Sequence, residues 1–167
     1  MEQMSAMFTK HSTEFWDLHF MDLAEVVSRP SKDPRRRVGA VVVDYLRRQV
    51  GSGYNGFPRH VLDHPDRYSD KFVKLKLVVH AEANAILNSV TTVVGCTLYC
   101  TSFPCSECAK IIVQSGISRV VCPTRTHMSQ QWRDDAEFSM LMFSEAGVQA
   151  EEIPRWTPSL ISDADLD

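Results

Sequence analysis

The sequence has no apolar run near the roughly 20 residues that a membrane-spanning helix needs, which argues against a helical membrane protein. Residues 1–10 lack the basic stretch and the apolar centre of a secretion signal. The five cysteines are an odd number and cannot all pair within one chain, so a disulfide framework is not expected. These absences predict a cytoplasmic protein, and in that compartment spaced cysteines usually bind metal or take part in catalysis.

An excess of basic residues is also missing, since 18 Lys and Arg stand against 21 Asp and Glu, a formal net charge of −3. Proteins that follow a phosphate backbone usually present a basic surface, so a polynucleotide is not the expected partner. Basic residues are clustered only locally, as at 35–37, which still suits a small anionic ligand. With no internal repeats, the chain is expected to form one domain over 1–167, with its core at about 10–153 and an acidic tail at 154–167.

Hydrophobic periodicity predicts a helix and a hairpin, followed by alternating helices and strands. The predicted helices are Ser12–Ser28, His80–Ser89, Cys105–Ser115 and Asp134–Ala146, and the predicted strands are Val38–Tyr45, Val50–Tyr54, Thr97–Cys100, Val120–Cys122 and Val148–Ile153. Residues 55–72 are expected to form a long polar loop. Trp132 and His127, before the last helix, are expected to cover the core, with stacking on a base as the alternative. This order predicts an α/β fold with helices on both faces of a mixed sheet.

Two short motifs indicate the chemistry. His80-Ala81-Glu82 opens one predicted helix, and Pro104-Cys105-Ser106-Glu107-Cys108 opens the next one. The two cysteines are three residues apart, so on a helix their sulfurs share one face. A helix N-terminus carries partial positive charge, which favours the thiolate form that binds metal. We therefore predict His80, Cys105 and Cys108 as the ligands of one zinc ion.

The number of ligands indicates catalysis. A structural zinc site normally has four protein ligands, whereas a catalytic site has three and keeps a position for water. Cys96, Cys100 and Cys122 lie in apolar sequence and are expected to be core residues. Zinc lowers the pKa of a bound water from 15.7 to about 7. Glu82 is then the predicted proton carrier, from water to a ring nitrogen and later to the departing amine.

Each motif has a plainer explanation when it stands alone. A single Cys-x-x-Cys can be redox-active, metal-binding or accidental, and a lone His-Ala-Glu is more often structural. Here the two occur together, in this order and at two predicted helix starts, and they match the H-x-E and P-C-x-x-C signature of zinc-dependent base deaminases. The combination predicts a hydrolytic deaminase.

The chain also resembles the deoxycytidylate (dCMP) deaminases of the cytidine deaminase superfamily over about residues 10–153. The shared stretches are Ser31-Lys32-Asp33-Pro34, Val38-Gly39-Ala40, Gly53-Tyr54-Asn55-Gly56-Phe57-Pro58-Arg59, His80-Ala81-Glu82-Ala83-Asn84-Ala85-Ile86 and Pro104-Cys105 with Cys108-Ala109-Lys110. The zinc motifs define the superfamily, and Gly-Tyr-Asn-Gly-Phe-Pro indicates this branch. The resemblance implies a cytidine-deaminase-like three-layer α/β/α fold with a mixed five-stranded sheet. It also implies one Zn²⁺ per chain and hydrolysis of dCMP to dUMP and ammonia, which feeds thymidylate synthesis.

The same resemblance implies roles in substrate binding. Asn55 would hydrogen-bond the sugar or the base, the Ala81 backbone would bind the pyrimidine carbonyl, and Val38 would pack on the ring. A common Asn-Gly turn is the alternative explanation for Asn55.

Regulation and assembly are further implications of the resemblance. Gly53, Tyr54 and Gly56 match a segment of the site at which dCTP activates and dTTP inhibits many family members. A bound triphosphate effector would be accompanied by Mg²⁺. Family members are commonly homo-oligomers, so a hexamer, or an assembly built on trimers or dimers, is expected.

The chain departs from the family pattern at two places. Arg35, Arg36 and Arg37 stand where small or polar residues are common, and His60 stands where glycine is frequent. Arginine binds phosphate through two parallel hydrogen bonds, so these arginines are candidate phosphate contacts and would favour dCTP as an additional substrate. A solvated basic corner is the alternative.

Two other functions remain open at this point. A deaminase acting on an unpaired base of tRNA or single-stranded DNA would use the same zinc site, although the acidic balance does not favour it. A zinc-stabilised binding module would keep the three ligands but would have no use for Glu82.

Overall fold

The computed structural model describes residues 12–154, so the predictions for residues 1–10 and for the tail beyond 154 lie outside the described residues. The helices are α2 (Thr13–Ser28), α3 (Pro65–Ser69), α4 (Lys71–Leu77), α5 (Ala81–Leu87), α6 (Ser106–Ser115) and α7 (Gln130–Ala146), with a 3₁₀ turn at Arg125–His127. The strands are β1 (Gly39–Val43), β2 (Gln49–Tyr54), β3 (Thr97–Cys100), β4 (Arg119–Pro123) and β5 (Gln149–Ile153). Every predicted strand and helix is present, with ends shifted by a few residues.

The five strands form one mixed sheet in the order β2-β1-β3-β4-β5. β1 pairs antiparallel with both β2 and β3, which confirms the predicted hairpin. β3, β4 and β5 are parallel to one another, and helices α6 and α7 make the crossovers between them. Parallel strands need such crossovers, so the alternation of helix and strand in the second half of the sequence dictates this part of the topology.

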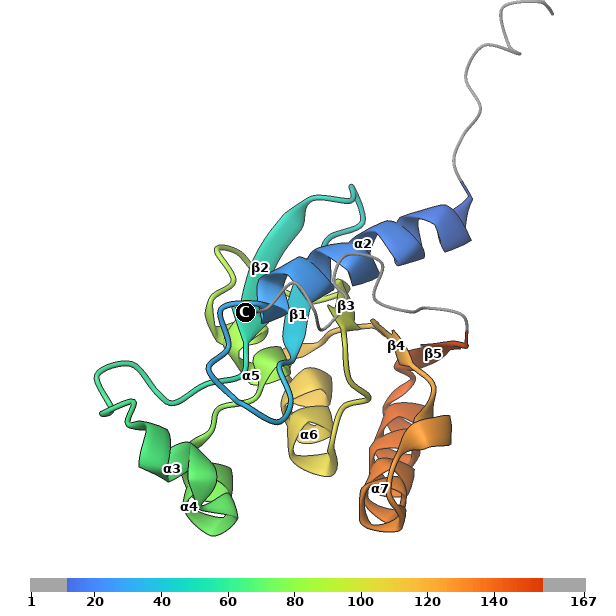
Figure 1. Cartoon of the computed structure of the whole chain (residues 1–167). Coiled ribbons are helices and arrows are strands. Elements are labelled where there is room, and N and C mark those ends of the chain that lie inside the picture. Colours follow the sequence, from blue (N-terminus) through green and yellow to red (C-terminus); the bar gives the residue numbers. More distant parts are fainter. Residues whose placement is uncertain (1–11, 155–167) are drawn as a thin grey trace, which may run out of the picture.

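Helices cover both faces of the sheet (Figure 1). On one face, Phe20, Met21 and Ala24 of α2 pack against alternate residues of β1, Val41 and Val43. On the other face, buried residues of α5, α6 and α7 pack against the intervening side chains of β1 and those of β3 and β4. All five residues of β1 are buried because its successive side chains point to opposite, equally covered faces. The predicted three-layer α/β/α arrangement is confirmed.

The prediction of a long loop at residues 55–72 is wrong in its second half. His64 caps α3, with its ring nitrogen accepting a hydrogen bond from the Asp66 amide at 3.3 Å, and Pro65 occupies the first turn. Asp70 caps α4 by accepting from the amides of Phe72 and Val73. These capping residues start two short helices where the hydrophobic pattern is too weak to predict them.

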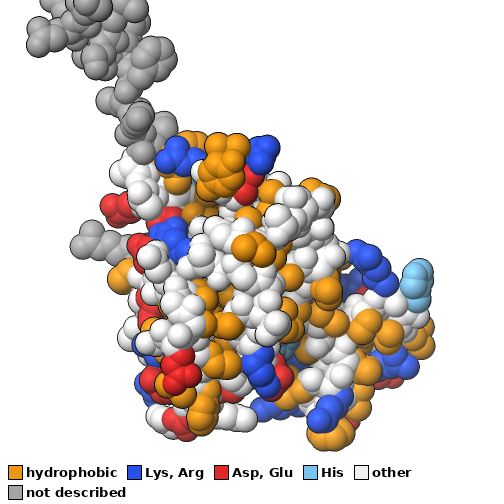
Figure 2. Space-filling view, turned by 180° about the vertical axis from the view of Figure 1, so that it is seen from behind, with side chains coloured by type: hydrophobic (Ala, Val, Ile, Leu, Met, Phe, Trp, Pro, Cys, Tyr) orange, Lys and Arg blue, Asp and Glu red, His pale blue; other side chains and the backbone are white. Residues whose placement is uncertain are grey.

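Helices α3 and α4 form a lobe beside the sheet (Figure 1). Figure 2 shows this lobe from behind, with Lys, Arg and hydrophobic side chains intermixed on its surface. Phe72 of α4 is 72% exposed, and Leu62, which precedes α3, is 65% exposed. Of the helices in residues 12–154, none combines the length and hydropathy of a bilayer-crossing segment.

His60 has a left-handed backbone conformation, with φ of +67°. Glycine adopts this conformation without strain, which explains why glycine is frequent at this position in the dCMP deaminases that the sequence resembles. We expect His60→Gly to raise the free energy of unfolding by about 0.5–1 kcal/mol, because relief of the left-handed strain outweighs the greater freedom of glycine in the unfolded chain. Chemical denaturation measures this change. Leu62→Gly is the control: Leu62 is exposed and its φ is not positive, so this variant should lose stability, and a loss in both variants would contradict the explanation.

Candidate metal centre and active site

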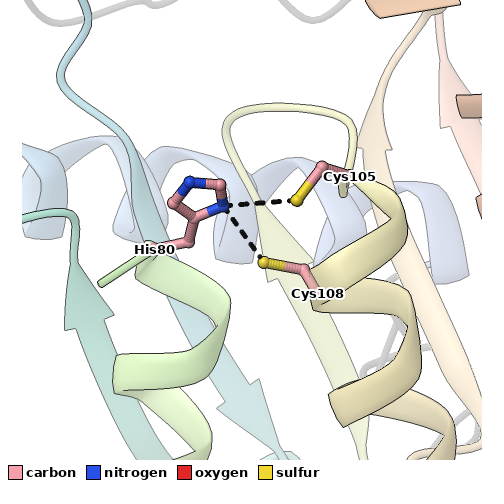
Figure 3. Close-up of side chains that lie close together, drawn as sticks. All are labelled: His80, Cys105 and Cys108. Atoms are coloured by element: carbon pink, nitrogen blue, oxygen red, sulfur yellow. Dashed lines mark hydrogen bonds between the residues drawn. The ribbon is translucent and has the colours of Figure 1, made fainter. Parts of the chain in front are cut away.

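The three predicted metal ligands converge at the N-termini of two helices (Figure 3). His80 is the N-cap residue of α5, Cys105 is the N-cap residue of α6, and Cys108 lies in the first turn of α6. The Nδ1 atom of His80 lies 3.3 Å from the sulfur of Cys105 and 3.3 Å from that of Cys108. All three candidate ligand atoms lie within 4.8 Å of one another.

This spacing fits a tetrahedral zinc ion. Zn–N bonds of about 2.0–2.1 Å and Zn–S bonds of about 2.3 Å place nitrogen and sulfur about 3.5 Å apart around a tetrahedron. Within residues 12–154, no fourth His, Cys, Asp or Glu joins this group. Two sulfurs and one imidazole nitrogen suit zinc, and a set of three protein ligands is typical of catalytic rather than structural sites.

The protonation of the two thiols also favours a cation between them. Hydrogen bonds from the Cys108 thiol and from His80 lower the pKa of Cys105 to about 4, although burial opposes this. The pKa of Cys108 is raised, first by its hydrogen bond to Cys105 and then by burial. A second thiolate beside the first is therefore unfavourable without a positive ion, and a divalent cation reverses that balance.

Glu82 lies in the first turn of α5, two residues after His80, and is only 4% exposed. Burial raises the pKa of its carboxyl group, and the nearby His80 lowers it by a smaller amount. A buried carboxyl group with a raised pKa beside a metal site is suited to accept a proton and to return it. It lies in the pocket described next, so it is accessible to a bound ligand.

The site lies in a pocket of the protein surface. His80, Glu82 and Cys105 line it, as do the three residues predicted to bind substrate, which are Val38, Asn55 and Ala81. Cys108 lies behind them and is 2% exposed. The structure therefore brings together the predicted ligands, the predicted proton carrier and the predicted substrate contacts.

Asn55 uses its side-chain amide inside the protein. Its Oδ1 accepts hydrogen bonds from the Val38 amide at 2.8 Å and the Ser31 hydroxyl at 2.7 Å. Its Nδ2 donates to the Arg36 carbonyl at 3.0 Å and lies 3.5 Å from Asp33 Oδ2. These bonds give Asn55 a positioning role for the loop before β1, and the direct substrate contact stays a prediction.

The residues predicted to bind effectors do not line the pocket. Gly53 is required for packing, because a Cβ atom there would lie 2.4 Å from the Ala85 backbone nitrogen of α5. Gly56 pairs with Val79 through backbone bonds of 2.8 and 3.1 Å, which places the segment after β2 beside His80. Tyr54 is 42% exposed. Packing thus accounts for Gly53 but not for Gly56, where a Cβ atom would lie 3.8 Å from the Tyr54 ring, and effector binding stays a prediction.

The three consecutive arginines differ in their relation to the pocket. All three are exposed, but only Arg36 lines the pocket. The sequence alone could not separate them, because their chemistry is the same and their orientation depends on the loop. In the structure, Asp33 holds the backbone of this loop by accepting from the amides of Arg35 and Arg36 at 2.9 and 3.3 Å.

Several pocket residues were not identified from the sequence. Lys74 of α4 lines the pocket and forms a buried ion pair with Asp33, with Nζ 2.8 Å from Oδ2. Phe103 also lines it. Trp132, for which stacking on a base was the alternative expectation, lines the pocket too. The prediction that Trp132 precedes the last helix and covers the core is wrong, because α7 already begins at Gln130 and Trp132 is 37% exposed. The structure gives no information on the side chain of His127.

Helix α7 holds the segment that carries the cysteines. Asp135 accepts hydrogen bonds from the Ser106 amide at 2.8 Å and the Ser106 hydroxyl at 2.6 Å. One turn further along, the Ser139 hydroxyl donates to the Pro104 carbonyl at 3.0 Å. Asp135 thus fills the capping role at the start of α6 that the Cys105 side chain does not perform.

We expect Asp135→Ala to weaken zinc binding about 10-fold and to lower the free energy of unfolding by about 1–3 kcal/mol, because the Ser106 amide and hydroxyl lose their partner. Chelator competition and chemical denaturation measure the two effects. Asp134→Ala is the matched control, since Asp134 bonds only to the exposed Gln130. Equal zinc affinity in both variants would show that Asp135 does not position Cys105.

Known proteins share this site and fold. The family model of the cytidine and deoxycytidylate deaminase zinc-binding region matches residues 14–124. Human deoxycytidylate deaminase is 40% identical over 141 residues, covering 80% of this chain and 76% of the human protein. An uncharacterised deaminase of Aliivibrio fischeri is 40% identical over 140 residues, covering 83% of this chain and 94% of its own.

Solved structures agree with the sequence relatives. The dCMP deaminase of cyanophage S-TIM5 is 27% identical in its apo form, with a TM-score of 0.63, and its complex with dCMP and dUMP is 26% identical, with a TM-score of 0.66. In both cases 86% of this chain and all of the phage chain are covered. The family match spans the hairpin, Glu82 and both metal-ligand motifs, and the chain belongs to the cytidine and deoxycytidylate deaminase family of zinc-binding hydrolases.

Proposed function

We propose that the substrate is dCMP, which the enzyme hydrolyses at C4 of the cytosine ring to give dUMP and ammonia. The observation that carries this proposal is the buried carboxylate of Glu82 beside a three-ligand metal group, in a pocket that Val38, Asn55 and Ala81 also line. The relatives named deoxycytidylate deaminase and the phage enzyme complexed with dCMP and dUMP support the choice of nucleotide.

His80, Cys105 and Cys108 are the proposed zinc ligands. Zinc in such a three-ligand site supplies an activated water at neutral pH. Glu82 accepts a proton from the attacking water and delivers it to N3 of the ring as the new C4–O bond forms. It then passes the second water proton to the amine, so that the C4–N bond breaks and ammonia leaves. Because water provides both protons and the oxygen, Glu82 ends each cycle as it began.

The pocket walls orient the ring for this chemistry. Ala81 begins α5, so its backbone amide has no partner within the helix and is the proposed donor to the pyrimidine carbonyl. Val38 and Phe103 provide apolar surface for the ring. Asn55 fixes Val38 through the 2.8 Å bond to its amide, so its proposed effect on substrate is through the position of Val38.

Ammonia release from zinc-loaded protein tests the proposal, with deoxycytidine, dCMP and dCTP as substrates. The expected result is the highest kcat/KM for dCMP. Absence of turnover with dCMP would reject the proposal, and turnover of an unpaired cytosine in single-stranded DNA in its place would support the polynucleotide alternative. On the face that Figure 2 shows, basic side chains are interspersed with acidic and hydrophobic ones, so this face lacks the continuous basic surface that the alternative needs.

Other expectations extend this proposal and await their own tests. Use of dCTP as a substrate, activation by dCTP with Mg²⁺ and inhibition by dTTP can be measured in the same assay. Sedimentation measures the predicted homo-oligomer. A single domain over 1–167 and a cytoplasmic location also stay predictions.

A further inference from the structure

Arg36 stands out among the charged residues of the pocket. It lines the same pocket as Glu82 and His80, and it is carried by the loop between α2 and β1. Its side chain is exposed, yet its backbone is held on both sides. The Arg36 amide donates to Asp33 Oδ1 at 3.3 Å, and the Arg36 carbonyl accepts from Asn55 Nδ2 at 3.0 Å.

The two residues that hold Arg36 are themselves buried. Asp33 is 4% exposed and Asn55 is 6% exposed. Burying such polar groups is costly unless their hydrogen bonds are made, so their bonds to the loop define its conformation strongly. The backbone of Arg36 is therefore preorganised, which lowers the entropic cost of binding a ligand with its side chain.

The charges around the pocket leave Arg36 as the available cation. Lys74 also lines the pocket, but its ammonium group is paired with Asp33 at 2.8 Å and its side chain is only 11% exposed. In residues 12–154, no carboxylate forms an ion pair with the Arg36 guanidinium. A dianionic group entering this part of the pocket would thus meet one unpaired guanidinium beside a neutral Lys–Asp pair.

We propose that Arg36 binds the 5′-phosphate of the substrate and makes the enzyme select a nucleotide over a nucleoside. The proposal rests on the proposed deamination of dCMP and adds the residue that determines its phosphate specificity. The planar guanidinium donates two parallel hydrogen bonds to phosphate oxygens, which gives both affinity and orientation. Asp33 and Asn55 act as positioning residues, because they touch the Arg36 backbone and not the phosphate.

The neighbouring arginines provide matched controls. Arg35 and Arg37 are the immediate sequence neighbours of Arg36 and have the same side chain, but they do not line the pocket. If the phosphate were attracted only by the summed positive charge of residues 35–37, all three arginines would contribute similarly to nucleotide binding. If Arg36 binds the phosphate directly, only the loss of Arg36 should weaken nucleotide binding.

The experiment measures kcat/KM for dCMP and for deoxycytidine in the zinc-loaded full chain and in Arg35→Gln, Arg36→Gln and Arg37→Gln. For Arg36→Gln we expect a loss of about 30–100-fold with dCMP, mainly through KM, because a hydrogen-bonded charge pair is removed. With deoxycytidine the same variant should stay within about 2-fold of wild type. Arg35→Gln and Arg37→Gln should stay within about 3-fold with both substrates.

A binding measurement separates recognition from catalysis. In titration calorimetry, Arg36→Gln should weaken dUMP binding by a similar factor and leave deoxyuridine binding unchanged. Equal losses for nucleotide and nucleoside, similar losses in all three variants, or wild-type dCMP kinetics in Arg36→Gln would each overturn the proposal while the deaminase function stands. Failure of the wild-type enzyme to convert dCMP would instead reject the function itself.

Discussion

Replacing Glu82 with Gln is expected to lower kcat for dCMP by about 10³-fold or more, while zinc content and stability are kept. The amide has nearly the same shape as the carboxylate but cannot carry a proton from water to the ring and on to the amine. General acid–base groups contribute about 10²–10⁴-fold, and Glu82 acts in both directions within one cycle, which places it in the upper part of this range.

The expected retention of stability follows from the environment of Glu82. Its carboxyl group is 4% exposed, and burial raises its pKa, which means that the folded protein disfavours the charged form. A neutral amide in this place removes that cost, so the free energy of unfolding should be unchanged or slightly higher. Active sites often have such built-in strain, and stability gained on losing the functional group is its usual sign.

The matched control is Glu107→Gln. Glu107 also lies in the first turn of a helix that carries metal ligands, but it is exposed and its carboxylate pairs with Lys110 on the surface. Steady-state kinetics, metal analysis and chemical denaturation should find this variant indistinguishable from wild type. If Glu82→Gln keeps more than about a tenth of the wild-type kcat, another group moves the proton and the assignment of Glu82 fails.

The local part of the site could be predicted from the sequence because it depends on short spacings. His80 and Glu82 are two residues apart and Cys105 and Cys108 are three apart, and each pair lies at the start of a helix. Once those helices form, the positions of the side chains relative to each helix are fixed. The proximity of the two helix N-termini depends on tertiary structure, and it was expected from the resemblance to a known family.

The other part of the site could not be predicted because its partners are far apart in the chain. Lys74 pairs with Asp33 across 41 residues, and it lies on a helix whose start depends on capping by Asp70 rather than on hydrophobic periodicity. Arg36 differs from Arg35 and Arg37 in lining the pocket and in the bond that its carbonyl accepts from Asn55, which lies 19 residues further along the chain. No pattern of residue types encodes such a difference.

The glycines of the Gly-Tyr-Asn-Gly segment show a related limit. The resemblance connected them with an effector, whereas the structure gives Gly53 a packing reason, which is the close contact of β2 with α5. A glycine required by both packing and ligand binding has the same sequence signal. Effector titration, rather than the motif, therefore has to decide on regulation.

Replacing Cys105 with Ser is expected to remove zinc and to abolish turnover. A serine hydroxyl stays protonated at neutral pH, so the site loses one of its two thiolates and much of its charge. Structural zinc sites bind with about 10–16 kcal/mol, and loss of one of three ligands should reduce the occupancy to a small fraction of the one ion per chain expected for wild type. Metal analysis after dialysis measures this directly.

The loss of zinc should also destabilise the fold around it. Without the ion, His80 and the buried Cys108 remain on two helix starts with no common ligand. Zinc added to wild type should therefore raise the unfolding temperature, since a ligand that binds only the folded state stabilises it, and zinc added to Cys105→Ser should not.

Cys96→Ser is the control that distinguishes the loss of a metal ligand from the loss of a buried thiol. Cys96 is 4% exposed and belongs to the core, where its thiol donates a weak hydrogen bond to the Thr92 carbonyl at 3.9 Å. This variant should lose stability by about 1–2 kcal/mol for burying a hydroxyl, yet keep its zinc and most of its turnover. If Cys105→Ser retains zinc and activity as well as Cys96→Ser does, the three-ligand site is wrong, because the ion would then be held by other groups.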